Sequence, residues 1–278
     1  MAITAQDVNK LRQMTGAGMM DCKKALQEAD GDFDKAVDIL RKQGQKVAAK
    51  RADNAVSEGT VLINISADGT NGKLVALACE TEPVSNVEDF KNLAQSILDK
   101  AVADNITDKD ALLAATLADG RPVSEHMVEL TGKLGEKLEI SAYENISADQ
   151  VVPYIHSNGK LGVLVAFTGV NGSDVAELGK DVAMQIAAMK PIAVDKDGVD
   201  AATIEREIEV GKEQARAEGK PEAMLEKIAQ GKLQKFYKDS TLLNQEFVKD
   251  SSLTIRQLLE KTGKELTVST FKRVAIGG

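Results

Sequence analysis

The chain has 278 residues, of which 43% are hydrophobic and 28% charged, as is typical of a soluble protein with two or three domains. Aromatic residues make up only 3%, tryptophan is absent, and the formal net charge is -8. This composition argues against base stacking and against coating of a phosphate backbone, so we expect no direct nucleic-acid partner.

The charge is unevenly distributed along the chain. The first 52 residues hold ten basic and seven acidic side chains, a net charge of +3, which leaves -11 for the remainder. A basic module on an acidic body predicts a docking module for an acidic protein surface. A chance imbalance on solvated helices explains the charge equally well.

Targeting and cofactor signals are missing from the sequence. The N-terminal residues contain no apolar signal segment, and there is no run of 18 apolar residues, so we expect a cytoplasmic protein without a membrane contact. Cys22 and Cys79 lie among apolar neighbours, which predicts buried free thiols in a reducing compartment. With His126 and His156 as the only histidines, no metal-ligand spacing occurs. We therefore expect neither a metal nor a cofactor.

Residues 4–44 show the apolar spacing of three short helices. Glycines interrupt the pattern at Thr15–Gly18, Asp32 is a candidate N-cap for the third helix, and Gly44 is a candidate stop. The apolar faces are Val8, Leu11 and Thr15 in the first helix, Cys22, Ala25, Leu26 and Ala29 in the second, and Phe33, Ala36, Val37 and Leu40 in the third. We predict a helical bundle over residues 1–45, similar to a ubiquitin-associated (UBA) domain, and a polar, basic linker over 46–58.

Met19, Met20 and Lys23 lie at the start of the second helix, largely off its apolar stripe. Methionine adapts to irregular surfaces, and such a patch beside lysines suits a partner protein. The alternative is that both methionines fill gaps in the small core, and the spacing does not distinguish the two.

From Gly59 the apolar period changes from 3.6 to 2, which predicts strands and a hairpin followed by a helix. The pattern recurs, because Asn158–Leu161 repeats the sequence of Asn71–Leu74 and Val175 begins a helix as Val87 does. We predict a core of two related half-domains, unless the four-residue identity is coincidental. The expected bounds are 59–140 for the first half and 141–190 with 240–278 for the second, with a strand over 137–145 opening the second half.

Residues 191–239 are strongly charged and contain two helical runs joined at Gly219-Lys220-Pro221. Glycine at a stop and proline at a first turn fit a tight helical hairpin. An antiparallel coiled-coil arm projecting from the body fits this pattern, and an ordinary pair of surface helices is the alternative. The expected fold class is thus α+β, with a helical bundle, a two-part core and an inserted helical arm.

No catalytic site is predicted. The sequence lacks a G-x-S-x-G motif, a Walker loop and a dinucleotide fingerprint, and the glycine-rich Thr15–Gly18 stretch lacks the preceding strand and the GK[ST] ending of a phosphate loop. His156 has no nucleophile in its sequence neighbourhood, and a lone histidine is usually structural or on the surface. We expect a protein that is not an enzyme.

The run TGAGMMDCKKAL at residues 15–26, the following DGDFDKAVDILR helix and the basic VAAKR segment closely resemble the N-terminal signature of the elongation factor Ts family. The GKP turn of the arm and the EKIAQGKLQKFYKDSTLLNQEFVKD segment extend the resemblance over nearly the whole chain. Members of that family are guanine-nucleotide exchange factors for elongation factor Tu, a translation GTPase. The resemblance implies the same role here, in which the factor binds the GDP form and promotes GDP release. An adaptor that binds a polypeptide or a ubiquitin-like surface through its bundle is the alternative.

The resemblance also implies roles for particular residues. The bundle docks on the GTPase domain, and the matching contacts are Arg12, Met19, Met20 and Lys23. His156 matches a histidine that reaches a different domain of the GTPase. The helical arm, or the core, would mediate a possible homodimer.

A family loop that reads Thr-Asp-Phe-Val disturbs the GTPase's magnesium and phosphate site with its phenylalanine. Here the loop is Thr81, Glu82, Pro83 and Val84, so proline replaces the aromatic wedge. Loss of a buried aromatic contact costs roughly 3 kcal/mol, about a hundredfold in an equilibrium. A matching change in the partner, compensation by other contacts, or weak exchange would each account for this departure.

Overall fold

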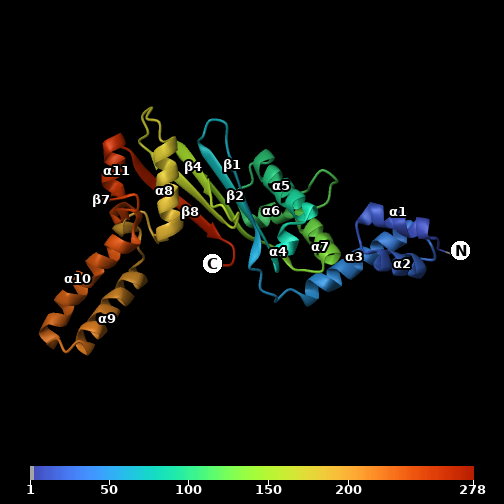
Figure 1. Cartoon of the computed structure of the whole chain (residues 1–278), viewed down its shortest axis with the longest axis horizontal. Coiled ribbons are helices and arrows are strands. Elements are labelled where there is room, and N and C mark those ends of the chain that lie inside the picture. The colour runs from blue at the N-terminus through green and yellow to red at the C-terminus, as the bar shows by residue number, and fades with distance from the viewer. Residues whose placement is uncertain (1–2) are drawn as a thin grey trace.

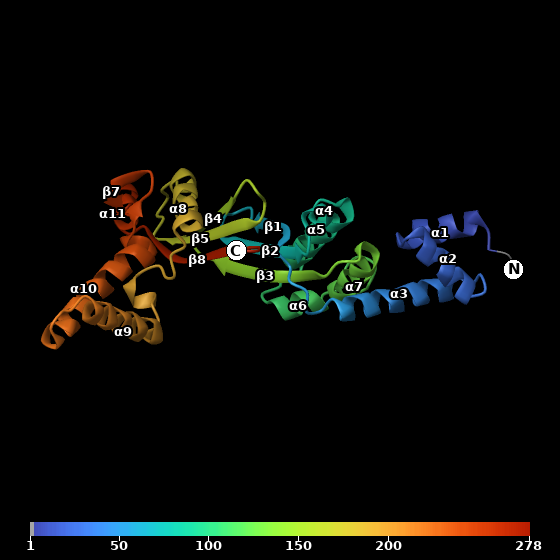
Figure 2. The ribbon, with the colours of Figure 1, turned by 60° about the horizontal axis from the view of Figure 1, so that its bottom comes forward.

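A computed structural model describes residues 3–278 and shows an elongated molecule. A helical bundle forms one end, a β-sheet core with helices on its outer faces forms the middle, and a pair of long helices projects at the other end (Figure 1). The rotated view in Figure 2 shows the same order along the long axis. The N-terminal bundle and the projecting arm therefore lie far apart.

The structure combines a helical bundle, a core of strands and helices, and a helical arm, and the α+β prediction is confirmed. The helices are α1 (Ala5–Thr15), α2 (Met19–Glu28), α3 (Phe33–Lys50), α4 (Glu82–Ser85), α5 (Glu88–Ala103), α6 (Lys109–Ala114), α7 (Val123–Leu134), α8 (Ala176–Met189), α9 (Ala201–Ala217), α10 (Glu222–Ser240) and α11 (Ile255–Thr262), with 3₁₀ turns at Lys196–Gly198 and Leu242–Asn244. The strands are β1 (Glu58–Ile65), β2 (Asn71–Cys79), β3 (Leu138–Ser147), β4 (Gln150–Ile155), β5 (Leu161–Thr168), β6 (Glu246–Phe247), β7 (Asp250–Thr254) and β8 (Thr267–Ala275).

The core strands form two antiparallel sheets of the same design. The strand orders are β1-β2-β3 and β4-β5-β8, and β6 and β7 pair separately. The strand predicted over 137–145 is β3, which pairs with β2 in the first sheet. The expectation that this strand opens the second half is therefore wrong, because its hydrogen bonds complete the first half.

The internal repeat is present, although the four-residue identity aligned it in the wrong register. In β2 and β5 the ladder to the third strand shifts between Ala76 and Leu77 and between Ala166 and Phe167. Equivalent residues of β2 and β5 therefore lie 90 positions apart. The sequence identity instead pairs Asn71, in β2, with Asn158, which lies in the turn before β5. The helix alignment holds, since Val87 and Val175 are the N-cap residues of α5 and α8.

Three apolar layers hold the core together. Alternate residues of β2 and β3 pack outward against α5 and α7, and those of β5 and β8 pack outward against α8 and α11. The remaining residues of both sheets pack against each other in a third cluster, made of Val61, Leu74, Ala76, Ala78, Ile146, Val151, Leu164, Ala166, Val274 and Ile276. The central strands are therefore buried on both faces, and the core is a helix–sheet–sheet–helix sandwich.

The bundle forms as predicted in its first two helices and differs in the third. Cys22, Ala25 and Leu26 are fully buried, and the Asp32 side chain caps α3 by accepting from the Lys35 amide at 3.1 Å. Gly44, however, does not end the helix, which continues to Lys50. The linker expected from residue 46 is thus helical as far as residue 50.

Gly44 lies where α3 crosses α7 of the core. A Cβ atom on Gly132 of α7 would lie 2.5 Å from the Gly44 Cα, and one on Gly44 would lie 3.3 Å from the Val128 carbonyl oxygen. The close approach of the two helices therefore requires glycine at 132 and is tight for any other residue at 44. The glycine that looks like a helix stop is instead a contact residue, because tertiary packing compensates its poor helix propensity.

The arm consists of α9 and α10, joined at Gly219 and Pro221, and forms a projecting antiparallel pair (Figure 1). Gly211 of α9 approaches Ala229 of α10 closely, since an added Cβ would lie 3.1 Å from the Ala229 Cα. Within residues 3–278, no helix combines the length and the hydropathy needed to cross a membrane.

The crossing of α3 and α7 gives a stability prediction. Gly132→Ala places a methyl group against the Gly44 backbone, and overpacking of this kind costs about 1–3 kcal/mol. Urea unfolding should show this loss. Gly231→Ala is the matched control, because its added Cβ in α10 meets nothing within 4 Å, so higher helix propensity should stabilise the protein by roughly 0.5–1 kcal/mol. Equal effects of the two substitutions would contradict the close crossing.

Candidate functional site

The predicted docking residues of the bundle are all exposed. Arg12 lies on α1, and Met19, Met20 and Lys23 lie on the first turns of α2; these four residues are called the bundle surface below. The exposed fractions are 55% for Met19 and 61% for Met20. The alternative that both methionines fill the core is therefore wrong, and their thioethers are accessible to a partner.

A glycine turn positions the methionines. Gly16 ends α1 with φ of 66° and donates its N–H to the Arg12 carbonyl at 2.7 Å. A left-handed residue is favourable there only for glycine. After this turn, Gly18 is the N-cap of α2, and Cys22 points into the core. The first turn of α2 is therefore exposed for two reasons. The glycine turn sets the direction of the helix, and the buried face of Cys22, Ala25 and Leu26 points the other way.

Residues Thr81–Val84, called the 81–84 segment below, follow the end of β2 and differ from the polar loop that the sequence predicts. Glu82–Ser85 form the single helical turn α4, with proline in its first turn. Glu82 and Pro83 are exposed, whereas Val84 is only 9% exposed and packs in the core of the first half. The segment is thus anchored by one apolar side chain and presents the two residues before it.

Glu80, directly before this segment, is the centre of a hydrogen-bond cluster. Its carboxylate accepts from Arg51 Nη1 at 2.8 and 2.9 Å, from Asn54 Nδ2 at 2.9 Å and from the Lys137 amide at 2.7 Å. The Lys137 amide and, after it, the Arg51 and Asn54 donors hold the pKa of Glu80 below its usual range, against an opposing effect of burial. Glu80 is thus a fixed anion that joins three segments of the chain.

A reciprocal pair of contacts completes this cluster. The Glu136 carboxylate accepts from the Thr81 amide at 3.0 Å and from the Thr81 hydroxyl at 2.6 Å. Residues 80 and 81 are thereby bound to residues 136 and 137 in both directions. Arg51, Asn54, Glu80, Thr81, Glu136 and Lys137 are called the Glu80 cluster below. Sequence reasoning missed these partners, because no local spacing connects residues about 30 and 55 positions apart.

Both cysteines are buried and unpaired, as the sequence predicts. The Cys79 thiol donates to the Thr81 carbonyl at 3.3 Å, and burial raises the pKa of Cys79 to about 12. A thiol in this state is a poor nucleophile, so Cys79 supports the backbone of the 81–84 segment and does not react.

His156 lies in the turn between β4 and β5 and is exposed. Its Nδ1 atom is 2.9 Å from the Tyr154 hydroxyl, and the neighbouring Ile155 is 42% exposed. The structure thus gives His156 an aromatic neighbour and a free surface. Among the described residues, no group of three or more His, Cys, Asp or Glu side chains is arranged to hold a metal ion.

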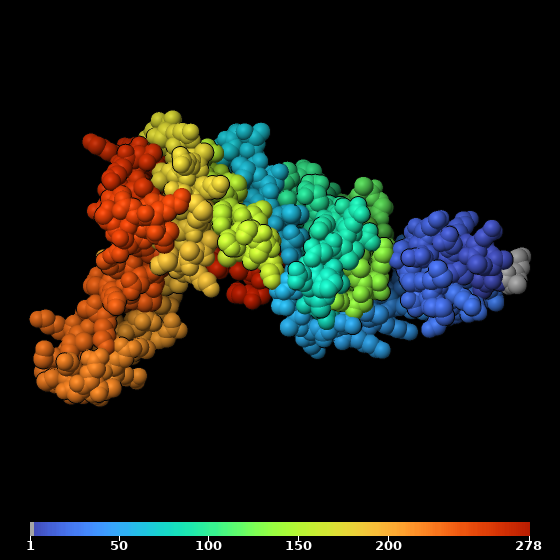
Figure 3. Space-filling view, viewed as in Figure 1, coloured from blue at the N-terminus to red at the C-terminus, as the bar shows by residue number. Residues whose placement is uncertain are grey.

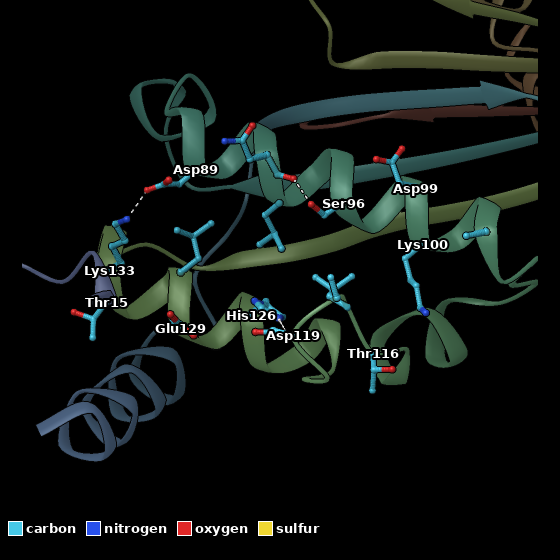
Figure 4. A pocket seen from close by; sticks show the side chains of 16 residues that line it. Thr15, Asp89, Ser96, Asp99, Lys100, Thr116, Asp119, His126, Glu129 and Lys133 are labelled. Carbon is cyan, nitrogen blue, oxygen red and sulfur yellow. Dashed lines mark hydrogen bonds and ion pairs between the residues drawn. The ribbon is translucent and has the colours of Figure 1, made fainter. Parts of the chain in front are cut away.

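A groove of about 820 Å³ lies between α5 and α7 (Figure 4). Its acidic side chains are already partnered: Asp119 Oδ1 is 3.0 Å from His126 Nε2, Asp89 accepts from Lys133 at 2.5 Å, and Glu129 accepts from Arg121. The Arg121 side chain and amide are the main causes that lower the pKa of Asp119. Asp99, which also lines the groove, accepts from Gln95 Nε2 at 2.8 Å. The acidic groups of the groove are thus bound to neighbouring side chains.

The structure does not bring the predicted site residues into one cluster. The bundle surface, the 81–84 segment and the His156 turn lie at separate places along the molecule, and no hydrogen bond or ion pair of residues 3–278 joins any two of them directly. In Figure 3 the bundle (blue) lies at one end, and the yellow-green part of the core lies near the middle of the molecule. Such an arrangement suits a large partner that contacts several places at once.

Comparisons with known proteins agree over the whole chain. A family model described as elongation factor TS matches residues 80–278. The chain is 66% identical over 274 residues to elongation factor Ts of Cytophaga hutchinsonii, covering 99% of both proteins. It is 55% identical over 277 residues to elongation factor Ts of Amoebophilus asiaticus, covering 100% of both, and 48% identical over 275 residues to that of Flavobacterium psychrophilum, covering 99% of both.

The lowered pKa of Glu80 predicts how its contribution to stability depends on pH. An unfolded glutamate titrates near pH ~4.3, so the contribution is complete above that pH and is lost as the pH falls through the lower folded value. Glu80→Gln should therefore lower the melting temperature at pH 7, and its difference from the unmodified protein should shrink below about pH 4. Thermal unfolding monitored by circular dichroism between pH 7 and pH 3 checks this. If the difference in melting temperature stayed constant with pH, the loss would come from altered packing or hydrogen bonding and not from the missing charge.

Proposed function

The chain belongs to the elongation factor Ts family, and from this premise we propose that it promotes guanine-nucleotide exchange on elongation factor Tu during translation elongation. The observation that carries the proposal is the 66% identity over 99% of both chains with a protein of that name. The protein binds the GDP form of the GTPase and accelerates GDP release, after which GTP binds. We expect it to act in the cytoplasm, where translation takes place.

The mechanism we propose is allosteric and involves no covalent step by this chain. An exchange factor binds the nucleotide-free GTPase more tightly than the GDP form, and thermodynamic linkage then requires that it weaken GDP by the same factor. No catalytic group or cofactor of this chain is needed. The magnesium ion that is disturbed belongs to the partner.

The bundle surface supplies docking affinity in this proposal. Its exposed methionines Met19 and Met20, next to the cations of Arg12 and Lys23, fit an apolar and acidic patch on the GTPase domain. His156 makes a separate contact with another domain, which its exposure and its distance from the bundle allow. The arm is left free in this scheme for a second copy of the chain or another partner.

The 81–84 segment supplies the difference between the two states of the partner. Glu82 and Pro83 are presented outward by an anchored helical turn, and the carboxylate of Glu82 can oppose the partner's metal and phosphate site by charge. Pro83 has a smaller apolar body than phenylalanine and a fixed φ, so it does not fill a pocket shaped for a phenyl ring. The exchange activity therefore depends on the position of the turn as well as on its side chains.

Release of a fluorescent GDP analogue from the elongation factor Tu of the same organism tests the proposal. The unmodified protein should accelerate release by about 100-fold at saturation, within the range typical of coupling between sites. Pro83→Phe should leave this maximum within about threefold, because the contacts of Glu136 and Glu80 order the turn before the partner binds and so offset the missing ring. Acceleration by Pro83→Phe alone would mean that the wedge is required. No acceleration and no binding by either form would reject exchange and favour the adaptor alternative.

Two substitutions should separate docking from exchange. Met20→Ala should raise the half-saturating concentration by about tenfold with an unchanged maximal release rate, as expected for loss of an apolar interface anchor. Glu82→Gln should lower the maximal rate with an unchanged half-saturating concentration, because it removes charge at the nucleotide site alone. Met224→Ala, on a methionine of the arm that is 48% exposed, is the control and should change neither quantity. A lowered maximum for Met20→Ala would contradict this division of roles.

A further inference from the structure

The Glu80 cluster connects the docking bundle to the 81–84 segment. Its first partner, Arg51, is the C-cap residue of α3, the helix whose other end belongs to the bundle. Another member of the cluster, Thr81, is the first residue of the segment that the proposed function assigns to exchange. The two regions that must meet the partner together are thus joined through one small group of side chains.

The path from the bundle to this cluster is rigid. Helix α3 is continuous from Phe33 to Lys50 and is fixed to α7 at the crossing of Gly44 and Gly132. A continuous helix transmits position along its length, so the end of α3 is set by the bundle and by the core together. Arg51 and Asn54, at and just after the end of α3, then donate hydrogen bonds to the Glu80 carboxylate and so fix its place relative to the helix.

The turn that is positioned packs on β1, β2 and α5, but its own backbone hydrogen bonds are weak. The amides of Ser85 and Asn86 bond to the Thr81 and Glu82 carbonyls at long distances of 3.3 Å. An isolated helical turn is not stable by itself, because nucleation of a helix is unfavourable. The buried Val84 side chain and the packing on β1, β2 and α5 fix one side of this turn, and its direction depends further on how Glu80 and Thr81 are held at its start.

We propose that the Arg51–Glu80 ion pair is a positioning element that holds the 81–84 segment in a fixed place relative to the bundle surface, so that one partner engages both. This inference rests on the proposed function. Neither residue needs to touch the nucleotide. The Arg51 side chain is 37% exposed, so solvent screens its charge, and Asn54 and the Lys137 amide still bind Glu80 when Arg51 is replaced. Removal of Arg51 alone should therefore act locally and cost little global stability.

The test replaces Arg51 and compares it with its neighbour. Arg51→Met keeps an unbranched apolar stem and removes the charge and the hydrogen bonds. Lys50→Met removes the same charge one residue earlier, from an exposed side chain for which residues 3–278 provide no ion pair. Arg51→Lys keeps the charge and tests rescue. The melting temperatures of all three should lie close to that of the unmodified protein.

Two measurements are made on each variant. Hydrogen exchange of the free protein reports the 81–84 segment directly, and Arg51→Met should speed exchange of the Ser85 and Asn86 amides about tenfold. In the GDP release assay, Arg51→Met should lower the maximal rate about tenfold and leave the half-saturating concentration within twofold, as expected for lost positioning. Lys50→Met should change neither, and Arg51→Lys should recover part of both.

The outcomes separate this inference from the proposed function. Unchanged hydrogen exchange in Arg51→Met, or equal effects of Arg51→Met and Lys50→Met, would overturn it. A raised half-saturating concentration with an unchanged maximum would also overturn it, because Arg51 would then act in docking alone. Faster hydrogen exchange together with an unmodified protein that does not accelerate GDP release would reject the exchange function and leave the positioning role of Arg51 supported.

Discussion

The face-to-face contact of the two sheets depends on the absence of side chains at Gly72 and Gly162. A Cβ on Gly162 would lie 2.5 Å from Val61 Cγ1, and one on Gly72 would lie 2.8 Å from Val151 Cγ1. Van der Waals repulsion at such distances would separate the sheets and open voids in the layer that they share. Because β2 and β5 are buried on both faces, the helices pack on the outside of the sandwich, and the bundle, the 81–84 segment and the His156 turn all lie beyond the ends of these central strands.

These three regions are connected to the first sheet. Helix α3 is packed on the first half through α7, and the 81–84 segment follows directly from β2. The turn that holds His156 is fixed to β1, where the Val61 amide donates to the Gly159 carbonyl at 2.8 Å and Lys160 pairs with Glu58 at 3.0 Å. Helix α3, the 81–84 segment and the His156 turn are therefore all attached to the first sheet, which fixes their relative positions. In the proposed function, this attachment makes simultaneous contact with several domains of a GTPase possible without ordering on binding.

Local patterns predicted most elements, since apolar periodicity and glycine turns act within a few residues. The sequence also marked Met19 and Met20 as unusual, and their exposure decided between two open alternatives. Errors arose where distant packing overrides local preference. Gly44 has the properties of a helix stop, and only Gly132, 88 positions away, explains why the helix continues. The partners of Glu80 were invisible for the same reason, so the segment was located in the sequence while the residues that hold it were not.

In the proposed function, the replacement of the family's phenylalanine by Pro83 is less severe in an ordered turn than in a flexible loop. A buried phenyl ring contributes roughly 3 kcal/mol, whereas ordering the backbone of one residue costs about 1–2 kcal/mol. A turn that is ordered before the partner arrives avoids this cost for each of its residues, so two or three preordered residues offset the missing ring. Proline adds to the effect because its φ is fixed in the free chain as well. The side chain that weakens the contact thus also stiffens the segment that makes it, and the hydrogen bonds of Glu80 and Glu136 matter more here than they would beside a phenylalanine.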